Sequence, residues 1–310
     1  MKKEIQGLVS KFDGLTLEVE FVIPEEIVGI VQIAHGMAEH KERYEPFMEY
    51  LAEHGFLVAI HDHRGHGNSI KDRTELGYFY TENIEGIVED LYQVTRLLKE
   101  KYPDIPICLF SHSMGTLVAR NYIKKYDDEI DKLILCGPPT QNHAAGFALW
   151  MAKISKKVNG EKHRNQWIQK MAFGGYDKNG EINSWLSTDK GVVRLYNQDP
   201  CCGYVFTNNG FINLFQLMIS AFSKDGWEKK NPDLPILLIA GQDDPVIQSK
   251  RKYKKLVKII YVFLTIFLYL LKCPQSLILS ALRAFCFCGK PHISRSIFLY
   301  FHYQAWLKSW

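Results

Sequence analysis

Short apolar runs recur along the chain and alternate with segments whose apolar residues keep helical spacing. Residues 107–110 form a run suited to a buried strand, and residues 116–126 follow with helical spacing. Apolar positions between residues 84 and 98 predict a crossover helix. Because strands and helices alternate, we expect an α/β fold with a mostly parallel sheet covered on both faces. The other expected strands lie at residues 28–34, 56–60, 132–136 and 234–240.

One strand and one long segment do not follow this alternation. Residues 15–23 alternate apolar and polar side chains, which predicts an antiparallel edge strand. Residues 137–225 are rich in aromatic residues and methionine and are too long for a loop, so we expect an inserted helical cap. The expected divisions are a first part of the core at 1–136, the cap at 137–225, a second part of the core at 226–249 and a tail at 250–310.

The charge is divided unevenly along the chain. The net charge of the 310 residues is +4, but the 66 residues from Pro245 to Trp310 contain 11 Lys and Arg and no Asp or Glu. The first 244 residues therefore carry the remaining 27 basic residues and all 34 acidic ones. Since the body is acidic, the overall basic balance gives no support for nucleic-acid binding.

The amino-acid composition indicates the class of protein and the cellular compartment that we expect. A hydrophobic content of 46% and a charged content of 23% are those of a globular protein. The first residues carry two lysines without an apolar stretch behind them, so no signal peptide is expected. Seven cysteines without a paired framework favour a reducing compartment. We expect a cytoplasmic protein, with membrane association left open by the tail.

Ser113 stands between a predicted strand and a predicted helix, in the pattern Ser111-x-Ser113-x-Gly115. A nucleophilic serine on a sharp strand-to-helix turn requires small residues two positions away on either side. Ser111 replaces the more usual glycine and keeps that position small. By itself the pattern also fits an ordinary turn, so the interpretation of Ser113 as a nucleophile depends on further stretches.

Two further stretches supply partners for Ser113. In enzymes with such an elbow, the oxyanion is bound by the amide of the residue after the nucleophile and by an amide of the loop after an earlier strand. These positions are Met114 and Met37. The acid follows a late strand in the chain order serine, acid, histidine. We prefer Asp244 to Asp243, because it precedes a proline three residues after the glycine that ends the strand.

Histidines gather in two loops. Three of them lie within residues 61–66, where a metal cluster is one interpretation. The glycines beside them favour a tight structural loop, and no matching ligand set recurs nearby. We expect His35 to support its loop and not to take part in catalysis.

The chain resembles the α/β-hydrolase superfamily, and within it the monoacylglycerol lipase and lysophospholipase group, also known as the serine aminopeptidase S33 type. The resemblance covers residues 7–248 and implies an α/β-hydrolase fold with a helical cap. It further implies hydrolysis of a monoacylglycerol or lysophospholipid ester without a metal or organic cofactor. The motifs that carry it are His35-Gly36-Met37 with Glu39-His40, residues 62–69, His112-Ser113-Met114-Gly115 and Gly241-x-x-Asp244-Pro245-Val246. Within the expected cap, Trp185-Leu186-Ser187 and Asp199-Pro200-x-Cys202-Gly203 also resemble bacterial members.

The stretch after Lys250 departs from the pattern of this group, whose members place the triad histidine in a loop before the final helix. No histidine stands between Arg164 and Pro291. His292 is a weak candidate for the missing base, and His302 lies in a stretch unlike the family loop. The alternative function is a catalytically impaired hydrolase-fold protein that lacks this histidine.

The composition of the tail has two explanations. A basic stretch at 250–258 precedes 13 uncharged residues at 259–271, fewer than the roughly 20 that a membrane helix needs. Residues 250–290 would suit peripheral contact with a membrane surface. The absence of acidic residues also suggests translation in a shifted frame from about codon 250.

Overall fold

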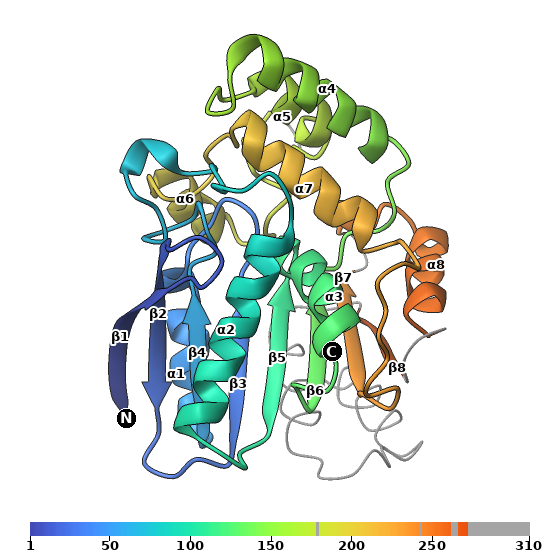
Figure 1. Ribbon diagram of the computed structural model, residues 1–310. Coiled ribbons are helices and arrows are strands. Elements are labelled where there is room, and N and C mark those ends of the chain that lie inside the picture. Colours follow the sequence, from blue (N-terminus) through green and yellow to red (C-terminus); the bar gives the residue numbers. More distant parts are fainter. Residues whose placement is uncertain (178–179, 242–243, 262–265, 272–310) are drawn as a thin grey trace.

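The computed structural model describes residues 1–177, 180–241, 244–261 and 266–271. These residues form one eight-stranded sheet in the order β1-β2-β4-β3-β5-β6-β7-β8 (Figure 1). The antiparallel pairs are β1 with β2 and β2 with β4, and the remaining neighbours are parallel. The strands are β1 Lys2–Val9, β2 Thr16–Ile23, β3 Gly29–Ala34, β4 Phe56–His61, β5 Ile107–His112, β6 Lys132–Cys136, β7 Ile236–Gly241 and β8 Ile266–Leu271.

The sheet confirms the expected α/β architecture and corrects one detail. Strand β5 lies between β3 and β6, so the residue that follows it emerges at the carboxyl end of the sheet. Strand β2 was expected at an edge, but it pairs with β1 on one side and β4 on the other. The expectation failed because β1 has exposed and half-buried residues in alternation and no buried apolar face to mark it as a strand.

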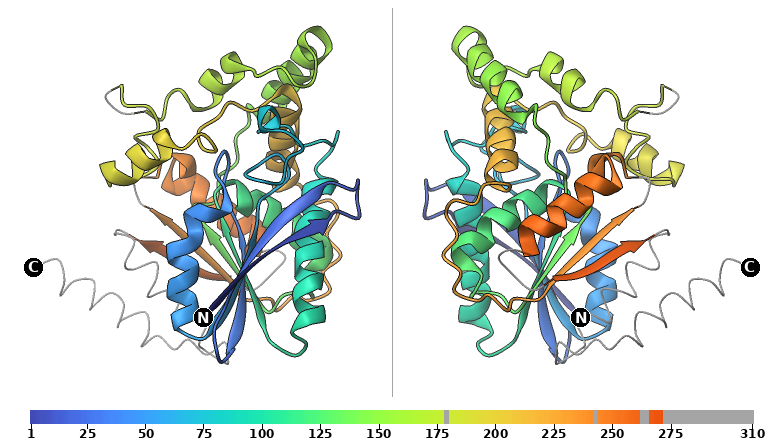
Figure 2. Two further views of the ribbon diagram at one scale, coloured as in Figure 1. Left: turned by 90° about the vertical axis from the view of Figure 1, so that its left-hand side faces the viewer. Right: turned by 90° about the vertical axis from the view of Figure 1, so that its right-hand side faces the viewer.

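Helices cover both faces of the sheet (Figure 2). Helix α1 packs on one face with β4, and its residues Met48 and Leu51 belong to the smaller of two apolar cores. Helices α2 and α3 pack together on the opposite face, in the larger core. The helices are α1 Glu45–Glu53, α2 Glu85–Lys101, α3 Met114–Tyr126, α4 Ala145–Asn159, α5 Gln166–Phe173, α6 Lys190–Gln198, α7 Asn208–Ser220 and α8 Lys250–Tyr261, with short 3-10 turns η1 Lys41–Tyr44, η2 Arg73–Glu75 and η3 Pro245–Ile247.

Helices α4 to α7 lie between β6 and β7 in sequence and sit above the carboxyl ends of the strands (Figure 1). Helix α7 is buried along most of its length and packs against both α4 and α3. Arg120 of α3 donates to the carbonyl oxygen of Ala221 at 2.6 Å and so ties the helix after the elbow to the end of α7. We call residues 137–225 the cap segment, which is the part of the chain expected to form the cap.

The segment after Lys250 begins with an element that packs on the body. Tyr253, Leu256 and Ile260 of α8 are buried and belong to the larger core, while its lysines face outward. Strand β8 then pairs in parallel with β7. In the part of the chain that the structure describes, no helix combines the length and apolar character needed to cross a bilayer.

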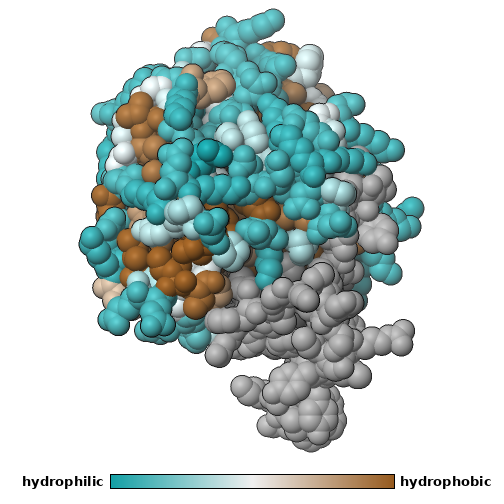
Figure 3. Space-filling view, turned by 60° about the horizontal axis from the view of Figure 1, so that its bottom comes forward, coloured by the Kyte–Doolittle hydropathy of each residue, from teal (hydrophilic) through white to brown (hydrophobic). Residues whose placement is uncertain are grey.

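Figure 3 shows the molecule tilted toward the amino ends of the parallel strands, and the coloured part of this surface is mainly hydrophilic with a hydrophobic area at lower left. The candidate active site lies at the opposite, carboxyl end of the sheet, beneath the cap segment.

Candidate active site

Ser113 occupies a strained turn between β5 and α3. Its backbone has φ 48° and ψ −114°, a conformation that costs a non-glycine residue of the order of 1–3 kcal/mol. The turn is held by neighbouring backbone, because the Ser113 amide donates to the carbonyl oxygen of Cys136 at 2.9 Å. The Ser113 carbonyl accepts from the amide of Thr116 at 2.9 Å and from its hydroxyl at 2.7 Å. This is the geometry that the sequence pattern predicts for an elbow.

The small residues beside Ser113 are required by close packing. A Cβ atom on Gly115 would lie 2.2 Å from the carbonyl oxygen of Ala34 and 2.6 Å from that of His35, so only glycine fits there. At the other position a side chain is tolerated, since the buried Ser111 hydroxyl donates to the carbonyl oxygen of Ile134 at 2.8 Å. The departure from glycine at residue 111 is therefore accommodated by one hydrogen bond.

The two candidate oxyanion donors border the same cavity as Ser113. Helix α3 begins at Met114, so its amide is among the first four N–H groups that have no acceptor within the helix. Met37 lies in the loop between β3 and η1. Neighbouring contacts hold this loop, because the Gly36 amide donates to Glu39 Oε1 at 2.6 Å and the Ala38 carbonyl accepts from the Gly203 amide at 2.9 Å.

Asp244 follows β7 and begins the turn η3, where its Oδ1 accepts from the Val246 amide at 2.9 Å. It lies close to the elbow. A Cβ atom on Gly137 would be 3.4 Å from Asp244 Oδ2 and 4.0 Å from His112 Nε2, so both side chains approach the same point beside Cys136. Burial raises the pKa of Asp244, although the Val246 amide and His112 act in the opposite direction. Asp243, the residue we did not prefer, lies outside the described residues.

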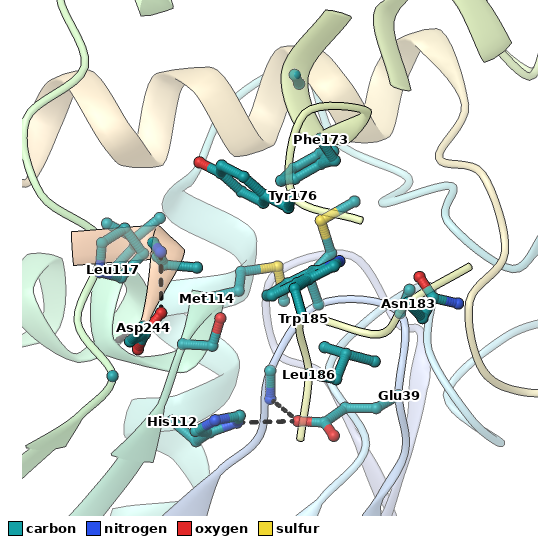
Figure 4. A pocket seen from close by; sticks show the side chains of 18 of the residues that line it. Glu39, His112, Met114, Leu117, Phe173, Tyr176, Asn183, Trp185, Leu186 and Asp244 are labelled. Atoms are coloured by element: carbon teal, nitrogen blue, oxygen red, sulfur yellow. Dashed lines mark hydrogen bonds and ion pairs between the residues drawn. The ribbon is translucent and has the colours of Figure 1, made fainter. Parts of the chain in front are cut away.

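A cavity of about 870 Å³ joins these groups. Ser113, Met37, Met114 and Asp244 all line it. Its wall on the side of the cap segment includes Phe173, Tyr176, Trp185 and Leu186 (Figure 4). A volume of this size is typical of sites for small molecules, and the mixture of apolar walls with a few polar groups suits a ligand with an acyl chain.

Comparison with known proteins decides the family. A family model described as serine aminopeptidase, S33, matches residues 25–261. The chain belongs to the serine aminopeptidase S33 family. The rat (Rattus norvegicus) monoglyceride lipase is 28% identical over 225 residues, which cover 72% of this chain and 68% of the relative. The monoacylglycerol lipase of Mycolicibacterium smegmatis is 30% identical over 172 residues, or 56% of this chain and 55% of that protein.

Solved structures agree with this assignment. A thermostable carboxyl esterase from Bacillus coagulans, in complex with glycerol, has a TM-score of 0.77 and 25% identity, covering 87% of this chain and 90% of its own. A soluble variant of the Saccharomyces cerevisiae monoglyceride lipase, in complex with a substrate analog, has a TM-score of 0.66 at 22% identity and 87% coverage of both chains, which shows the shared fold. The S33 chain is an α/β hydrolase of the lipase and esterase type, as its motifs predict.

The fold brings Ser113, Met37, Met114 and Asp244 together at one cavity, but the family histidine is not located. The sequence candidate His292 lies outside the described residues, as does His302. Among the described residues of this hydrolase, His112 is the histidine that lines the cavity.

Sequence reasoning missed the contacts of His112, because they join residues far apart in the chain. Its Nδ1 lies 3.3 Å from Glu39 Oε1 (Figure 4). The same nitrogen lies 3.1 Å from the hydroxyl of Tyr44. Glu39 also accepts from the Tyr44 hydroxyl at 2.8 Å and pairs with Arg43 at 3.2 Å. Burial opposes the charge on Glu39, but His112 and Arg43 outweigh it and hold the pKa of this carboxyl well below its usual value. Glu39 is therefore a buried carboxylate that holds residues 35–40, the candidate oxyanion loop, beside the elbow.

The histidines of the following loop are buried and form a packed group. His35 accepts from the amide of His63 at 2.9 Å and its other ring nitrogen donates to the carbonyl of Gly36 at 2.8 Å, which links the two loops. Burial lowers the pKa of both His61 and His66 to about 3. Among the described residues, the side-chain groups with metal-binding geometry do not include His61, His63 or His66.

Two other groups of side chains in the described part of the chain have spacing suitable for a metal ion. The first combines Glu18, Glu42 and Asp62, but the ammonium of Lys41 lies among them, 2.7 Å from Glu18 and 3.5 Å from Asp62. A lysine already balances these carboxylates, so the group forms an internal ion cluster. The second combines His40, Asp199 and Cys202, and in it His40 Nε2 lies 2.7 Å from Asp199 Oδ2.

Proposed function

We propose that this hydrolase cleaves carboxylic esters of lipid-derived substrates, monoacylglycerols or lysophospholipids, through an acyl-enzyme on Ser113. The observation that carries the proposal is the strained serine at the carboxyl end of the sheet, opening into a cavity that Met37, Met114 and the half-buried Asp244 also line. Backbone strain at a non-glycine residue persists only where its surroundings enforce it, and such positions cluster at functional sites.

The proposed reaction has two steps. Ser113 Oγ attacks the ester carbonyl carbon, and the Met37 and Met114 amides stabilise the negative charge on the carbonyl oxygen. The proton of the hydroxyl passes through a general base to the departing glycerol or phosphoglycerol oxygen. Water then attacks the acyl-enzyme and restores the serine. Asp244 would orient the base, and His292 is the sequence candidate for that base.

The walls of the cavity support a single acyl chain as the part of the substrate that is bound. Its lining combines apolar side chains of the cap segment, such as Phe173, Trp185, Leu186 and Phe215, with the polar groups at the elbow. The names of relatives point the same way, since the rat and mycobacterial proteins are lipases of monoacylglycerol.

Contact with a lipid surface is part of the proposal, and two described elements could provide it. The first is α8, whose outward lysines begin the segment 250–290 that the sequence suggested. The second is the outer face of α4, which exposes Phe147, Trp150, Ile154 and Val158. Residues 145–176 around that face contain six Lys and Arg against one Glu, a balance that favours anionic headgroups.

The test is labelling of the folded full chain by a fluorophosphonate probe, combined with hydrolysis of a monoacylglycerol and of an aminoacyl anilide. We expect labelling and ester hydrolysis that both disappear in Ser113→Ala, with no cleavage of the anilide. Ser111→Ala is the matched control, because it removes a nearby hydroxyl that already has a partner.

Three outcomes would contradict parts of the proposal. A folded wild-type chain that neither labels nor hydrolyses the ester would favour the impaired hydrolase, and a His292→Ala variant with unchanged turnover would remove that base. Cleavage of the anilide in preference to the ester would favour a peptidase on the same fold.

A further inference from the structure

A turn in the cap segment meets the oxyanion loop at His40. In this turn the Cys202 amide donates to the carbonyl of Asp199 at 3.0 Å, and the Cys201 amide donates to Asp199 Oδ1 at 2.8 Å. The second carboxylate oxygen, Oδ2, is left to face His40 Nε2 at 2.7 Å. The turn therefore directs an oxygen and a sulfur toward one imidazole nitrogen.

His40, Asp199 and Cys202 form a compact donor set. Their ligand atoms all lie within 4.8 Å of one another. His40 and Cys202 are buried, whereas the Asp199 side chain is 30% exposed and leaves a path from solvent. Imidazole nitrogen, thiolate sulfur and carboxylate oxygen are the ligands that zinc prefers, and sites with three protein ligands keep a fourth position for water.

The other ring nitrogen of His40, Nδ1, has the kind of carboxylate partner that is found in known zinc sites. His40 Nδ1 lies 2.5 Å from Glu42 Oε2, and the other oxygen of Glu42 contacts the ammonium of Lys41. Histidines that bind metals usually donate their second ring N–H to a carboxylate, which fixes the orientation of the ring. Glu42 holds His40 in this way, with Nε2 turned toward Asp199 and Cys202.

We propose that His40 Nε2, Asp199 Oδ2 and Cys202 Sγ bind a zinc-class divalent cation. The Nε2 and thiol protons pass to solvent when the metal binds, and a water completes the coordination. The ion would join the cap turn to the loop that carries Met37, and it lies outside the proposed acyl-transfer chemistry. The inference depends on this geometry alone and stands or falls separately from ester hydrolysis.

Adjacent cysteines provide a matched control. Cys201 Sγ accepts from the guanidinium of Arg73 at 2.9 Å, so it is turned away from His40, whereas Cys202 faces the site. Three further cysteines, Cys273, Cys286 and Cys288, lie outside the described residues. A metal-binding signal is therefore assigned to this site only if it disappears in Cys202→Ser and persists in Cys201→Ser.

The experiment adds Co²⁺ to the tag-free full chain after treatment with a chelator and records the thiolate-to-cobalt absorption band, followed by competition with Zn²⁺. We expect one equivalent of Co²⁺ to give a band that Zn²⁺ removes, that is lost in Cys202→Ser and His40→Asn and that is kept in Cys201→Ser. Glu42→Gln should weaken binding about 10- to 100-fold, as expected when the partner of a metal-bound histidine is lost. Zn²⁺ should raise the Tm of the wild type and leave that of Cys202→Ser unchanged.

Equal bands from the wild type and a folded Cys202→Ser would overturn the proposal, as would a band that depends on Cys201. Near-ultraviolet circular dichroism of each variant shows whether it is folded. If His40→Asn fails this check, the comparison between the two cysteine variants still decides the outcome.

Discussion

Glu39 is a single residue on which the geometry of the candidate oxyanion loop, residues 35–40, depends. Its carboxylate accepts from the Gly36 amide and the Tyr44 hydroxyl and lies against His112 and Arg43. Replacement by glutamine keeps the volume but removes the charge, so the loop loses its anchor beside the Met37 amide. Because one oxyanion donor is worth about 10² to 10³ in kcat, we expect Glu39→Gln to lower kcat by up to about 10²-fold with a smaller change in KM.

Steady-state hydrolysis of a monoacylglycerol measures this effect. Tyr44→Phe is the control, since it removes one hydrogen bond to the same carboxylate and leaves the charge in place. If Glu39→Gln raised KM and left kcat unaltered, Glu39 would belong to substrate binding and would have no role in positioning the loop.

The buried histidines set the response of the fold to acid. Burial, with a smaller effect of nearby His35, lowers the pKa of His61 and His66 to about 3 from 6.5 in the unfolded chain. Their neutral forms therefore support the fold fully above pH 6.5, and this stability is lost as the pH falls from 6.5 toward 3. Linkage gives a loss of about 2 kcal/mol for each histidine by pH 5.

His66→Phe isolates one of these contributions. The ring of His66 packs against Phe79, Tyr204 and Phe206 at centroid distances of 5.5, 5.8 and 5.4 Å, so phenylalanine suits the site. The free energy of unfolding is measured in urea at pH 7.5 and at pH 5. Its decrease between these two pH values should be about 2 kcal/mol smaller in the variant than in the wild type. Phe79→Leu, which alters packing in the same group without adding or removing a titrating side chain, should shift both values equally. An identical acid dependence in His66→Phe and wild type would show that His66 does not resist protonation in the fold.

Helix α4 is the element whose exposed face most needs an explanation. Ala145, Ala148 and Ala152 pack inward, while Phe147, Trp150, Ile154 and Val158 follow one outward stripe. Large exposed apolar patches on folded proteins mark interaction surfaces, and tryptophan at such a patch favours the interface of a bilayer. The surrounding lysines make an anionic lipid surface the partner that fits its charge.

The double variant Trp150→Ser with Ile154→Ser tests this role of α4. We expect binding to vesicles of phosphatidylglycerol and phosphatidylcholine to weaken by about tenfold or more, because two side chains that would be buried in lipid are lost. Ile5→Ser with Val9→Ser is the matched control, since these residues of β1 are similarly exposed at 61% and 60%. Sedimentation with vesicles measures both. Unchanged binding in the α4 variant would assign any lipid contact to another part of the chain, including residues 250–290.

The elements that could be predicted from sequence are those whose burial leaves a simple pattern. Strand β5 and helix α3 follow their apolar spacing closely, and the small residues around Ser113 predicted the elbow. Strand β1 could not be found, because an edge strand with few buried side chains has no apolar signal. The contact of Glu39 with His112 joins residues 73 positions apart, which no local pattern encodes. The apolar run after residue 258 was also ambiguous, since helix, strand and membrane segment share that composition.

At the scale of the whole molecule, the question is where the chain stops following its family. A shifted reading frame at about codon 250 would give an arbitrary sequence from there on. The structure instead packs Tyr253, Leu256 and Ile260 of α8 in the larger core, at spacings of three and four residues, and the family match continues to residue 261. An arbitrary sequence has no reason to direct apolar residues inward at helical spacing. We therefore propose that the departure begins after residue 261 and that α8 belongs to the core.

Leu256→Ala tests this proposal, because Leu256 is completely buried. If α8 belongs to the fold, the substitution should reduce the free energy of unfolding by about 3 kcal/mol through lost burial and an unfilled cavity. Lys255→Ala changes the exposed neighbour in the same helix and should stay within about 0.5 kcal/mol of the wild type. Urea unfolding followed by tryptophan fluorescence measures both. Equal, small effects of the two substitutions would place the boundary back near Lys250, and the larger core would then have to be stable without α8.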